Sequence, residues 1–451
     1  MKTLLSIALC FALVPLYSVS GQAADDTITV VVTGDVGFSR NNTPVDSRGV
    51  HKYGRRQPFA DATAAIARDI DGDLNFCNLE TVVTDRNDLP RDMKGQGRPY
   101  SFRTHPAAVR QLARVGFNMM SLANNHSMDY GVPGLKQTLK HMSAFSGKIT
   151  ANGIGMNREK AASPDVVRVK GAKVAFASIG IVTNNLARHR AGANTPGQIA
   201  YRFDDDYNYI TSRLAKTQAD YRMLSIHYGI ERQVRVDSRQ LRQYRGLAAR
   251  SRKIDLVIGH HAHVVRAVET VGNSVIFYGL GNFLHHGTAD MRRNSLCRDY
   301  GLMGKVYLKK GKGGRLITRA IEVIPVTMMH IRTQRYARVS DAIERVQVLN
   351  YLARDLDDAA NGARGTRFTP TSSGTGLYCF PGAAKDGGTI GKLCKGWRPA
   401  KPMSDALFKK IAASCGPGGK ASTSSASTGS TPAPATLRVK PRRKKALKLD
   451  R

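Results

Sequence analysis

The sequence predicts a mixed α/β fold, a sheet with helices packed against it. Between residues 27 and 325, short β-branched apolar segments alternate with amphipathic segments of helical period. Hydrophobic residues make up 41% of the chain and charged residues 23%, which excludes a wholly disordered chain, a collagen or a coiled coil. The 451 residues allow one large domain with appendages, or about three domains.

The expected elements follow from these two periods. Strands are predicted at 27–33, 74–79, 118–123, 173–178, 223–226, 256–259 and 275–279. Residues 305–310 and 316–324, separated by the glycine-rich segment 311–314, predict a hairpin. Helices are predicted at 58–70, 106–115, 132–143, 204–219 and 238–251, with a last helix at 340–358. The segment 360–415 is expected to be rich in loops, so 331–415 forms a helical and loop-rich extension.

The N-terminal residues have the pattern of a secretory signal. Lys2 precedes an apolar run from Leu4 to Val14, and Gly21 and Ala23 stand at the −3 and −1 positions of a cleavage site. An uncleaved membrane anchor is the alternative, but the run has about eleven residues against the roughly twenty that a span needs. We therefore expect removal of residues 1–23 and export of the chain to a periplasmic or extracellular location.

Five cysteines follow the predicted signal, and an odd number in an oxidising compartment leaves one thiol unpaired. Cys77 lies in an apolar, strand-like run, where a buried thiol behaves as a small hydrophobic side chain, so we expect it to be the free one. The other four, Cys297, Cys379, Cys394 and Cys415, can pair in three ways, and a bond between Cys379 and Cys394 would close a short loop.

The charge balance is strongly basic. The 69 Lys and Arg residues against 34 Asp and Glu residues give a net charge of +35, which predicts an acidic partner. Residues 416–451 change to Gly, Ser, Thr, Ala and Pro and end in a basic cluster, the composition of a disordered tail. Such a tail is either inert or adheres to an acidic polymer or an anionic membrane surface. Nucleic acid is not expected, because of the export signal.

Polar side chains stand at the carboxyl ends of the predicted strands, where ligands bind in open α/β sheets. Singly they are weak signals: Asp35 could belong to a turn, and His227 in an apolar run could be a core residue. For His261 and His263, the two-residue period of a strand would place both imidazoles on one face. Carboxylate, amide and imidazole groups suit divalent Mn, Fe or Zn, one or two ions. The polar residues at these strand ends are Asp35, Asn78, Glu80, Asn124, Asn125, His126, His227, His260, His261, His263 and Asn282.

Six segments resemble the bacterial CapA-type family of capsule and poly-γ-glutamate synthesis proteins, a branch of the calcineurin-like metallophosphoesterase superfamily. They are TGDVGF (33–38), FCNLETVVT (76–84), SLANNHSMDYGVPGL (121–135), IHYGIE (226–231), VIGHHAHVVRAVE (257–269) and FYGLGNF (277–283). The resemblance implies a four-layer α/β/β/α sandwich over residues 27–330, with metal ions at the edge of the sheets.

The resemblance also selects the candidate site residues among these polar side chains and implies a role for each. Asp35 and His263 match ligands of the first ion, Glu80 the bridging carboxylate, Asn125, His227 and His261 ligands of the second ion, and His126 the general acid. One position departs from the pattern: Gly37 stands where metallophosphoesterases have the His of Asp-x-His. This departure predicts one tightly held ion and a weaker second one. Asp129, Gly131 and Gly134 match the family's loop into the following helix, for which turn chemistry is a sufficient explanation.

Two functions remain open at this point. The first is an exported enzyme of capsule or poly-γ-glutamate biosynthesis, with a divalent-metal hydrolase-like site that acts on a phosphoryl or acyl bond. The second is a non-catalytic component of an envelope machine that binds and exports an acidic polymer. In both, the expected partners are polyglutamate or a capsular polysaccharide and a capsule-synthesis complex.

Overall fold

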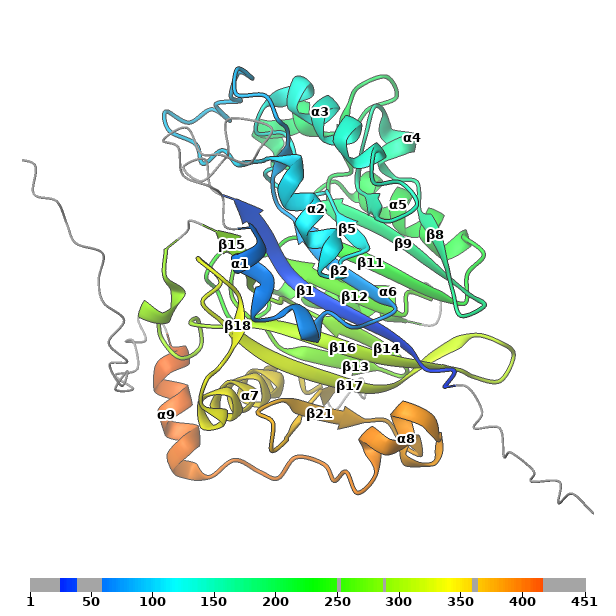
Figure 1. Cartoon of the computed structure of the whole chain (residues 1–451), viewed down its shortest axis with the longest axis vertical. Coiled ribbons are helices and arrows are strands. Elements are labelled where there is room, and N and C mark those ends of the chain that lie inside the picture. Colours follow the sequence, from blue (N-terminus) through cyan, green and yellow to red (C-terminus); the bar gives the residue numbers. More distant parts are fainter. Residues whose placement is uncertain (1–24, 39–58, 250–252, 287–288, 359–363, 417–451) are drawn as a thin grey trace, which may run out of the picture.

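Two sheets lie face to face with helices on their outer sides in the computed structural model (Figure 1). The structure describes residues 25–38, 59–249, 253–286, 289–358 and 364–416. The predicted signal and residues 417–451 of the predicted tail lie outside these ranges. Among the helices of the described ranges, none has the length and apolar character to cross a membrane.

The first sheet contains strands from the N-terminal and the C-terminal parts of the described chain. Its order, within the described residues, is β20 (Thr369–Pro370), β21 (Gly376–Cys379), β17 (Leu316–Thr327), β16 (Gly301–Lys310), β1 (Ile28–Phe38), β2 (Leu74–Leu79), β5 (Met119–Ser121) and β6 (Thr150–Asn152). In addition, β15 (Asn282–His286) pairs with β1, and β18 (Gln334–Arg335) with β17. Strands β1, β2, β5 and β6 are parallel, and β15 runs parallel to the last residues of β1. Several carboxyl ends therefore meet at one edge.

The second sheet has a parallel centre as well. Its described order is β19 (Arg364–Gly365), β13 (Val268–Val271), β14 (Ser274–Phe277), β12 (Leu256–His260), β11 (Tyr221–His227), β9 (Ala172–Gly180) and β8 (Asp165–Val169). Strands β9, β11, β12 and β14 are parallel. Two small ribbons pair β3 (Val82–Val83) with β4 (Arg103–Thr104), and β7 (Ile154–Gly155) with β10 (Gly197–Gln198).

Alternation along β1 shows why the layers form. Val30 and Val32 are fully buried in the core between the sheets, whereas Val31 is buried in the core beneath the outer helices. Both faces of the strand are covered, so its sequence is a continuous apolar run. Helices α1 (Phe59–Ala64), α2 (Pro106–Arg114) and α3 (Gly131–Ser143) cover the first sheet, and α5 (Asp204–Lys216) and α6 (Ser238–Ala248) cover the second. The expected four-layer α/β/β/α sandwich is confirmed.

The C-terminal segment contains more regular structure than expected. Helix α7 (Val339–Ala353) matches the predicted helix, but it is not the last, because α8 (Gly388–Cys394) and α9 (Asp405–Cys415) follow it. Strands β20 and β21 extend the first sheet, and β19 pairs with β13 of the second. These elements are too short to carry a clear apolar period, and helices of this length depend on tertiary packing.

The predicted cysteine pattern is confirmed. Disulfides join Cys297 to Cys415 and Cys379 to Cys394, and Cys77 is free and buried. Burial raises the pKa of the Cys77 thiol, so the group is an unreactive part of the core.

Candidate metal centre

The edge at which the two sheets meet brings all seven predicted site residues together. The shortest links are Asn125 Oδ1 to His227 Nε2 at 2.7 Å, His261 Nδ1 to His227 Nε2 at 3.2 Å, Asp35 Oδ2 to His263 Nδ1 at 3.2 Å, Glu80 Oε1 to His227 Nε2 at 3.5 Å and Glu80 Oε1 to His126 Nε2 at 3.8 Å. Residues from five separate segments thus lie in one cluster.

One half of the cluster centres on His227, the last residue of β11. Its Nε2 atom lies within 3.5 Å of Asn125 Oδ1, His261 Nδ1 and Glu80 Oε1. Ligand atoms that share a metal ion lie about 2.0–2.2 Å from it and therefore about 3–4 Å from each other. The distances from His227 Nε2 to His261 and Glu80 match that spacing, and the Asn125 oxygen lies slightly closer, at 2.7 Å.

The other half contains Asp35, Glu80, His263 and a histidine that the sequence analysis did not select, His285 of β15. Ligand atoms of Glu80, His263 and His285 all lie within 4.8 Å of one another. The Nδ1 atom of His263 faces Asn282 Oδ1 at 2.9 Å, which leaves Nε2 directed toward Glu80 at 3.9 Å. A polar partner on the opposite ring nitrogen is the usual way in which a metal-ligating imidazole is oriented.

The two histidines after β12 reach the cluster through a turn and not through strand alternation. Strand β12 ends at His260, and His261 and His263 have φ values of 80° and 55°. These are left-handed conformations that residues other than glycine rarely adopt, and they are found preferentially at functional sites. The expectation that the period of a strand places both imidazoles on one face was therefore wrong.

Two further buried polar residues contact members of the cluster. The Asn78 amide donates to Asp35 Oδ1 at 2.9 Å and lies 3.0 Å from His227 Nδ1, so it connects the two sheets. His260 is buried, and its Nδ1 atom lies 3.3 Å from Asp35 Oδ1. Both stand in the motifs quoted above, beside the residues that were selected, and only the three-dimensional arrangement distinguishes their positions from those of the candidate ligands.

The charges of the site fit a divalent cation. Burial acts to raise the pKa values of Asp35 and Glu80, and the charge of Glu80 acts to raise that of Asp35, but the surrounding imidazoles hold both below their ordinary range. Burial opposes protonation of His263, yet the two carboxylates raise its pKa to about 10. Among the described residues, neither oxygen of Glu80 has a hydrogen-bond partner of normal geometry, although both are fully buried. Two buried carboxylates with unsatisfied oxygens need a positive charge, which one or two bound ions would provide.

His126 is oriented by neighbours outside the ligand set. Its Nδ1 atom lies 2.7 Å from Oδ2 of Asp129, which is completely buried, and its ring stacks on Phe102 at 4.0 Å between centroids. Asp129 also accepts a hydrogen bond of 2.6 Å from the Phe102 backbone and pairs with Lys94. Asp129 therefore does more than the turn role expected for it, because its hydrogen bond to Nδ1 fixes the orientation of the His126 ring.

A cavity of about 280 Å³ opens beside the cluster. Asn125, His126 and His261 line one part of it, and Tyr100 and His189 line another. Two of the candidate ligands, Asn125 and His261, thus line the same space as the candidate general acid.

Fold and site together define a class. A four-layer α/β/β/α sandwich, with buried carboxylates and imidazoles gathered at the strand ends, is the architecture of the metallophosphoesterase-like proteins.

Comparison with known proteins identifies the family. Residues 29–286, more than half of the chain, match the family model described as bacterial capsule synthesis protein PGA_cap. The chain belongs to this family. The PGA biosynthesis protein CapA of Bacillus subtilis (strain 168) is 27% identical over 282 residues, which are 62% of this chain and 68% of that protein. The capsule biosynthesis protein CapA of Bacillus anthracis is 23% identical over 74% of this chain and 75% of that protein.

Among solved structures, a hypothetical protein from Thermus thermophilus matches with a TM-score of 0.37 and 15% identity, over 66% of this chain and 98% of that chain.

Proposed function

We propose that this chain is an exported, metal-dependent hydrolase of capsule or poly-γ-glutamate biosynthesis. The observation that carries the proposal is the convergence of two buried carboxylates and several imidazoles at one sheet edge, beside an oriented histidine and a cavity. The family membership supports the pathway, and the names of the two Bacillus relatives refer to the same process.

In this proposal each residue of the site has a defined task. Asp35, Glu80 and His263 would hold one ion, and Glu80, Asn125, His227 and His261 the other. When bound, such ions supply positive charge that polarises a phosphoryl or acyl oxygen, and they make water nucleophilic near neutral pH.

His126 would deliver a proton to the leaving group. Because Nδ1 is hydrogen-bonded to Asp129, Nε2 faces the cluster and the cavity. The proton that His126 would transfer is therefore the one on Nε2.

Replacement of His126 by Ala tests this assignment. We expect the variant to keep the metal content of the wild type and to lose about 100-fold to 10,000-fold in kcat, because general acid catalysis is lost while the ligand set is intact. Elemental analysis and a screen of phosphoester and amide substrates provide the two measurements. His141→Ala is the matched control, since His141 lies on α3 and pairs with Asp85, a half-exposed residue outside the cluster.

Metal content and activity together distinguish a role of His126 in metal binding from a role in proton transfer. Loss of metal in His126→Ala would make His126 a ligand and remove it from proton transfer. A wild-type protein that binds no Mn, Fe or Zn would contradict the hydrolase function and favour the polymer-binding alternative.

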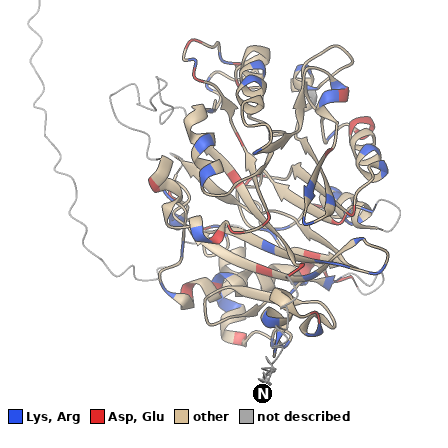
Figure 2. Ribbon diagram, turned by 45° about the vertical axis from the view of Figure 1, so that its right-hand side comes forward, with Lys and Arg blue, Asp and Glu red and all other residues tan. Residues whose placement is uncertain are grey.

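The polymer-binding alternative has its own support in the charge of +35. In the described part of the chain, Lys and Arg are interspersed with Asp and Glu over many elements (Figure 2), and many of them form ion pairs, such as Arg335 with Asp69 and Arg319 with Asp386. The densest basic stretch is instead in the sequence of the tail, with eight Lys and Arg residues between positions 438 and 451.

Deletion of residues 420–451 is therefore expected to weaken binding to poly-γ-glutamate or to anionic vesicles and to leave the free energy of unfolding unchanged. Because the attraction is electrostatic, the salt dependence of binding should decrease as well. A full-length variant with Gln at the eight basic positions controls for chain length and should behave like the deletion. Equal affinity and an equal salt slope in all three proteins would show that the tail is inert.

A further inference from the structure

We propose that His285 is a ligand of the first metal ion and replaces the imidazole that is missing at Gly37. This inference rests on the proposed metal-dependent function and adds a residue that the motif comparison did not select. It also changes the expected occupancy: the first site then has a complete ligand set, so two ions should bind tightly in place of one.

The first argument is the register between two neighbouring strands. Strands β1 and β15 are parallel, and Gly37 lies directly opposite His285. A Cβ atom added at Gly37 would lie 3.4 Å from His285 Nε2 and 3.5 Å from His285 Cδ2. The imidazole of His285 therefore occupies the space into which a side chain at position 37 would extend. A side chain from either position would fill the same space.

The second argument is the position of the His285 nitrogen. Its Nε2 atom lies 3.5 Å from Oε2 of Glu80, the candidate bridging residue. The other oxygen of this carboxylate, Oε1, faces His227. Together with His263, it completes a group of ligand atoms within 4.8 Å of one another. Oε2 of Glu80 thus faces His285, whereas Oε1 lies 3.5 Å from His227 and 3.9 Å from His263. The carboxylate therefore lies between both halves of the cluster, as expected for a carboxylate that bridges two ions.

The third argument is that the ring is held in place. His285 is 3% exposed, and its backbone N–H donates to Met329 O at 2.9 Å. The ring makes edge contacts with Phe102 at 5.1 Å and with His263 at 5.4 Å between centroids. Side chains that are confined in this way lose little conformational entropy when they bind an ion.

The alternative is that His285 only fills the space above Gly37. Replacement by Phe distinguishes the two roles, because Phe keeps a ring of similar size against Phe102 and has no ligand nitrogen. The neighbouring His286→Phe is the control: His286 belongs to the same strand and is also buried, but successive side chains of a strand point to opposite faces.

The test is titration of the metal-free full-length protein with Mn²⁺, followed by calorimetry and elemental analysis. The wild type and His286→Phe are expected to bind two ions per chain. His285→Phe is expected to bind the first ion at least about 10-fold more weakly, with the second ion retained. If His285→Phe folds poorly by circular dichroism, His285→Leu provides the same comparison with a smaller side chain that also lacks a ligand atom.

A reciprocal variant gives an independent check. Gly37→His combined with His285→Ala returns the imidazole to the position of the Asp-x-His pattern and empties the space it needs. We expect this double variant to recover part of the affinity lost in His285→Ala. Recovery should be incomplete, because the new Cβ would lie 3.0 Å from the Glu80 carbonyl oxygen.

The outcomes separate this inference from the proposed function. If His285→Phe binds two ions as tightly as the wild type, while His261→Ala loses one of them, His285 is a packing residue and the metal-dependent function still stands. If the wild type itself binds no Mn²⁺, both the inference and the proposed function are wrong.

Discussion

Replacement of Glu80 by Gln is expected to lower the affinity for divalent ions at both halves of the site by about 100-fold or more, the upper end of what supporting residues alone contribute. The reason is geometric. Oε1 of Glu80 lies 3.5 Å from His227 and Oε2 lies 3.5 Å from His285, so one carboxylate faces both sets of imidazoles. Gln keeps the shape of the side chain but removes the negative charge that both ions would share.

The same substitution should also lower the stability of the metal-free protein near neutral pH. Burial acts to raise the pKa of Glu80, but His263 and His227 hold it well below its ordinary range, so the folded protein favours the charged carboxylate. Gln removes this attraction, so the free energy of unfolding without metal should decrease. Equal stability of the two metal-free proteins would show that the imidazoles do not depend on the charge of Glu80.

Calorimetric titration with Mn²⁺ and urea unfolding of the metal-free proteins are the measurements. Glu231→Gln is the matched control, because Glu231 lines the same cavity, is exposed and lies outside the ligand cluster. Unchanged affinity in Glu80→Gln would rule out a bridging role.

Removal of the disulfide between Cys297 and Cys415 is expected to be the most destabilising change outside the site. The bond spans 118 residues and attaches the end of α9 to the segment after β15. A cross-link over roughly 100 residues stabilises by about 4.7 kcal/mol in the chain-entropy model, and one over roughly 15 residues by about 3 kcal/mol. The Cys379–Cys394 bond spans 15 residues, so it provides an internal comparison.

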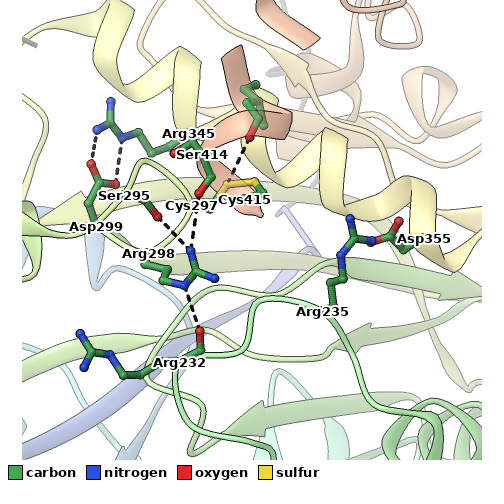
Figure 3. The surroundings of a disulfide bond; sticks show 11 residues. Arg232, Arg235, Ser295, Cys297, Arg298, Asp299, Arg345, Asp355, Ser414 and Cys415 are labelled. Carbon is green, nitrogen blue, oxygen red and sulfur yellow. Dashed lines mark hydrogen bonds and ion pairs between the residues drawn. A yellow bond between two sulfur atoms is a disulfide. The ribbon is translucent and has the colours of Figure 1, made fainter. Parts of the chain in front are cut away.

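The surroundings of the long-range bond add to this effect (Figure 3). Arg298 donates to the carbonyl oxygens of Arg232 at 3.1 Å and Ser414 at 3.5 Å, which links the end of α9 to the loop that follows β11. The nearby pair of Arg345 and Asp299 is almost completely buried. These contacts depend on the segment 295–299 keeping its position beside α9.

Urea unfolding measures the difference in lost stability between two double variants. One combines Cys297→Ala with Cys415→Ala, and the other combines Cys379→Ala with Cys394→Ala. Alanine at both positions avoids leaving a reactive thiol. A thiol titration of the unfolded, non-reduced wild type should find only Cys77, which verifies both bonds. A smaller loss of stability for the 297–415 variant than for the 379–394 variant would contradict the chain-entropy argument.

Much of the fold could be predicted because its signals are local. The β-branched run that forms β1 and the apolar run that forms β2 have the lengths and residue types of buried parallel strands. The candidate ligands were found because a parallel sheet places the residue after each strand at the same edge. Cys77 could be identified as the free thiol because its neighbours in the sequence are apolar.

Other features depend on contacts between distant segments. The left-handed conformations of His261 and His263 are not local preferences of histidine, and they persist only because the surrounding structure imposes them. The role of Asp129 follows from the placement of Lys94 and the Phe102 backbone around its carboxylate, which no sequence spacing reveals.

By itself, the sequence determined the α/β class, the order of the strand ends and the types of ligand they carry, since each depends on residues within a few positions of one another. The tertiary structure alone decided that His285 lies opposite Gly37 and that Cys297 reaches Cys415. The physical reason is that strand register and helix docking are set by packing across the whole core. A one-residue shift in register would turn His285 to the opposite face of its strand and leave the space above Gly37 empty.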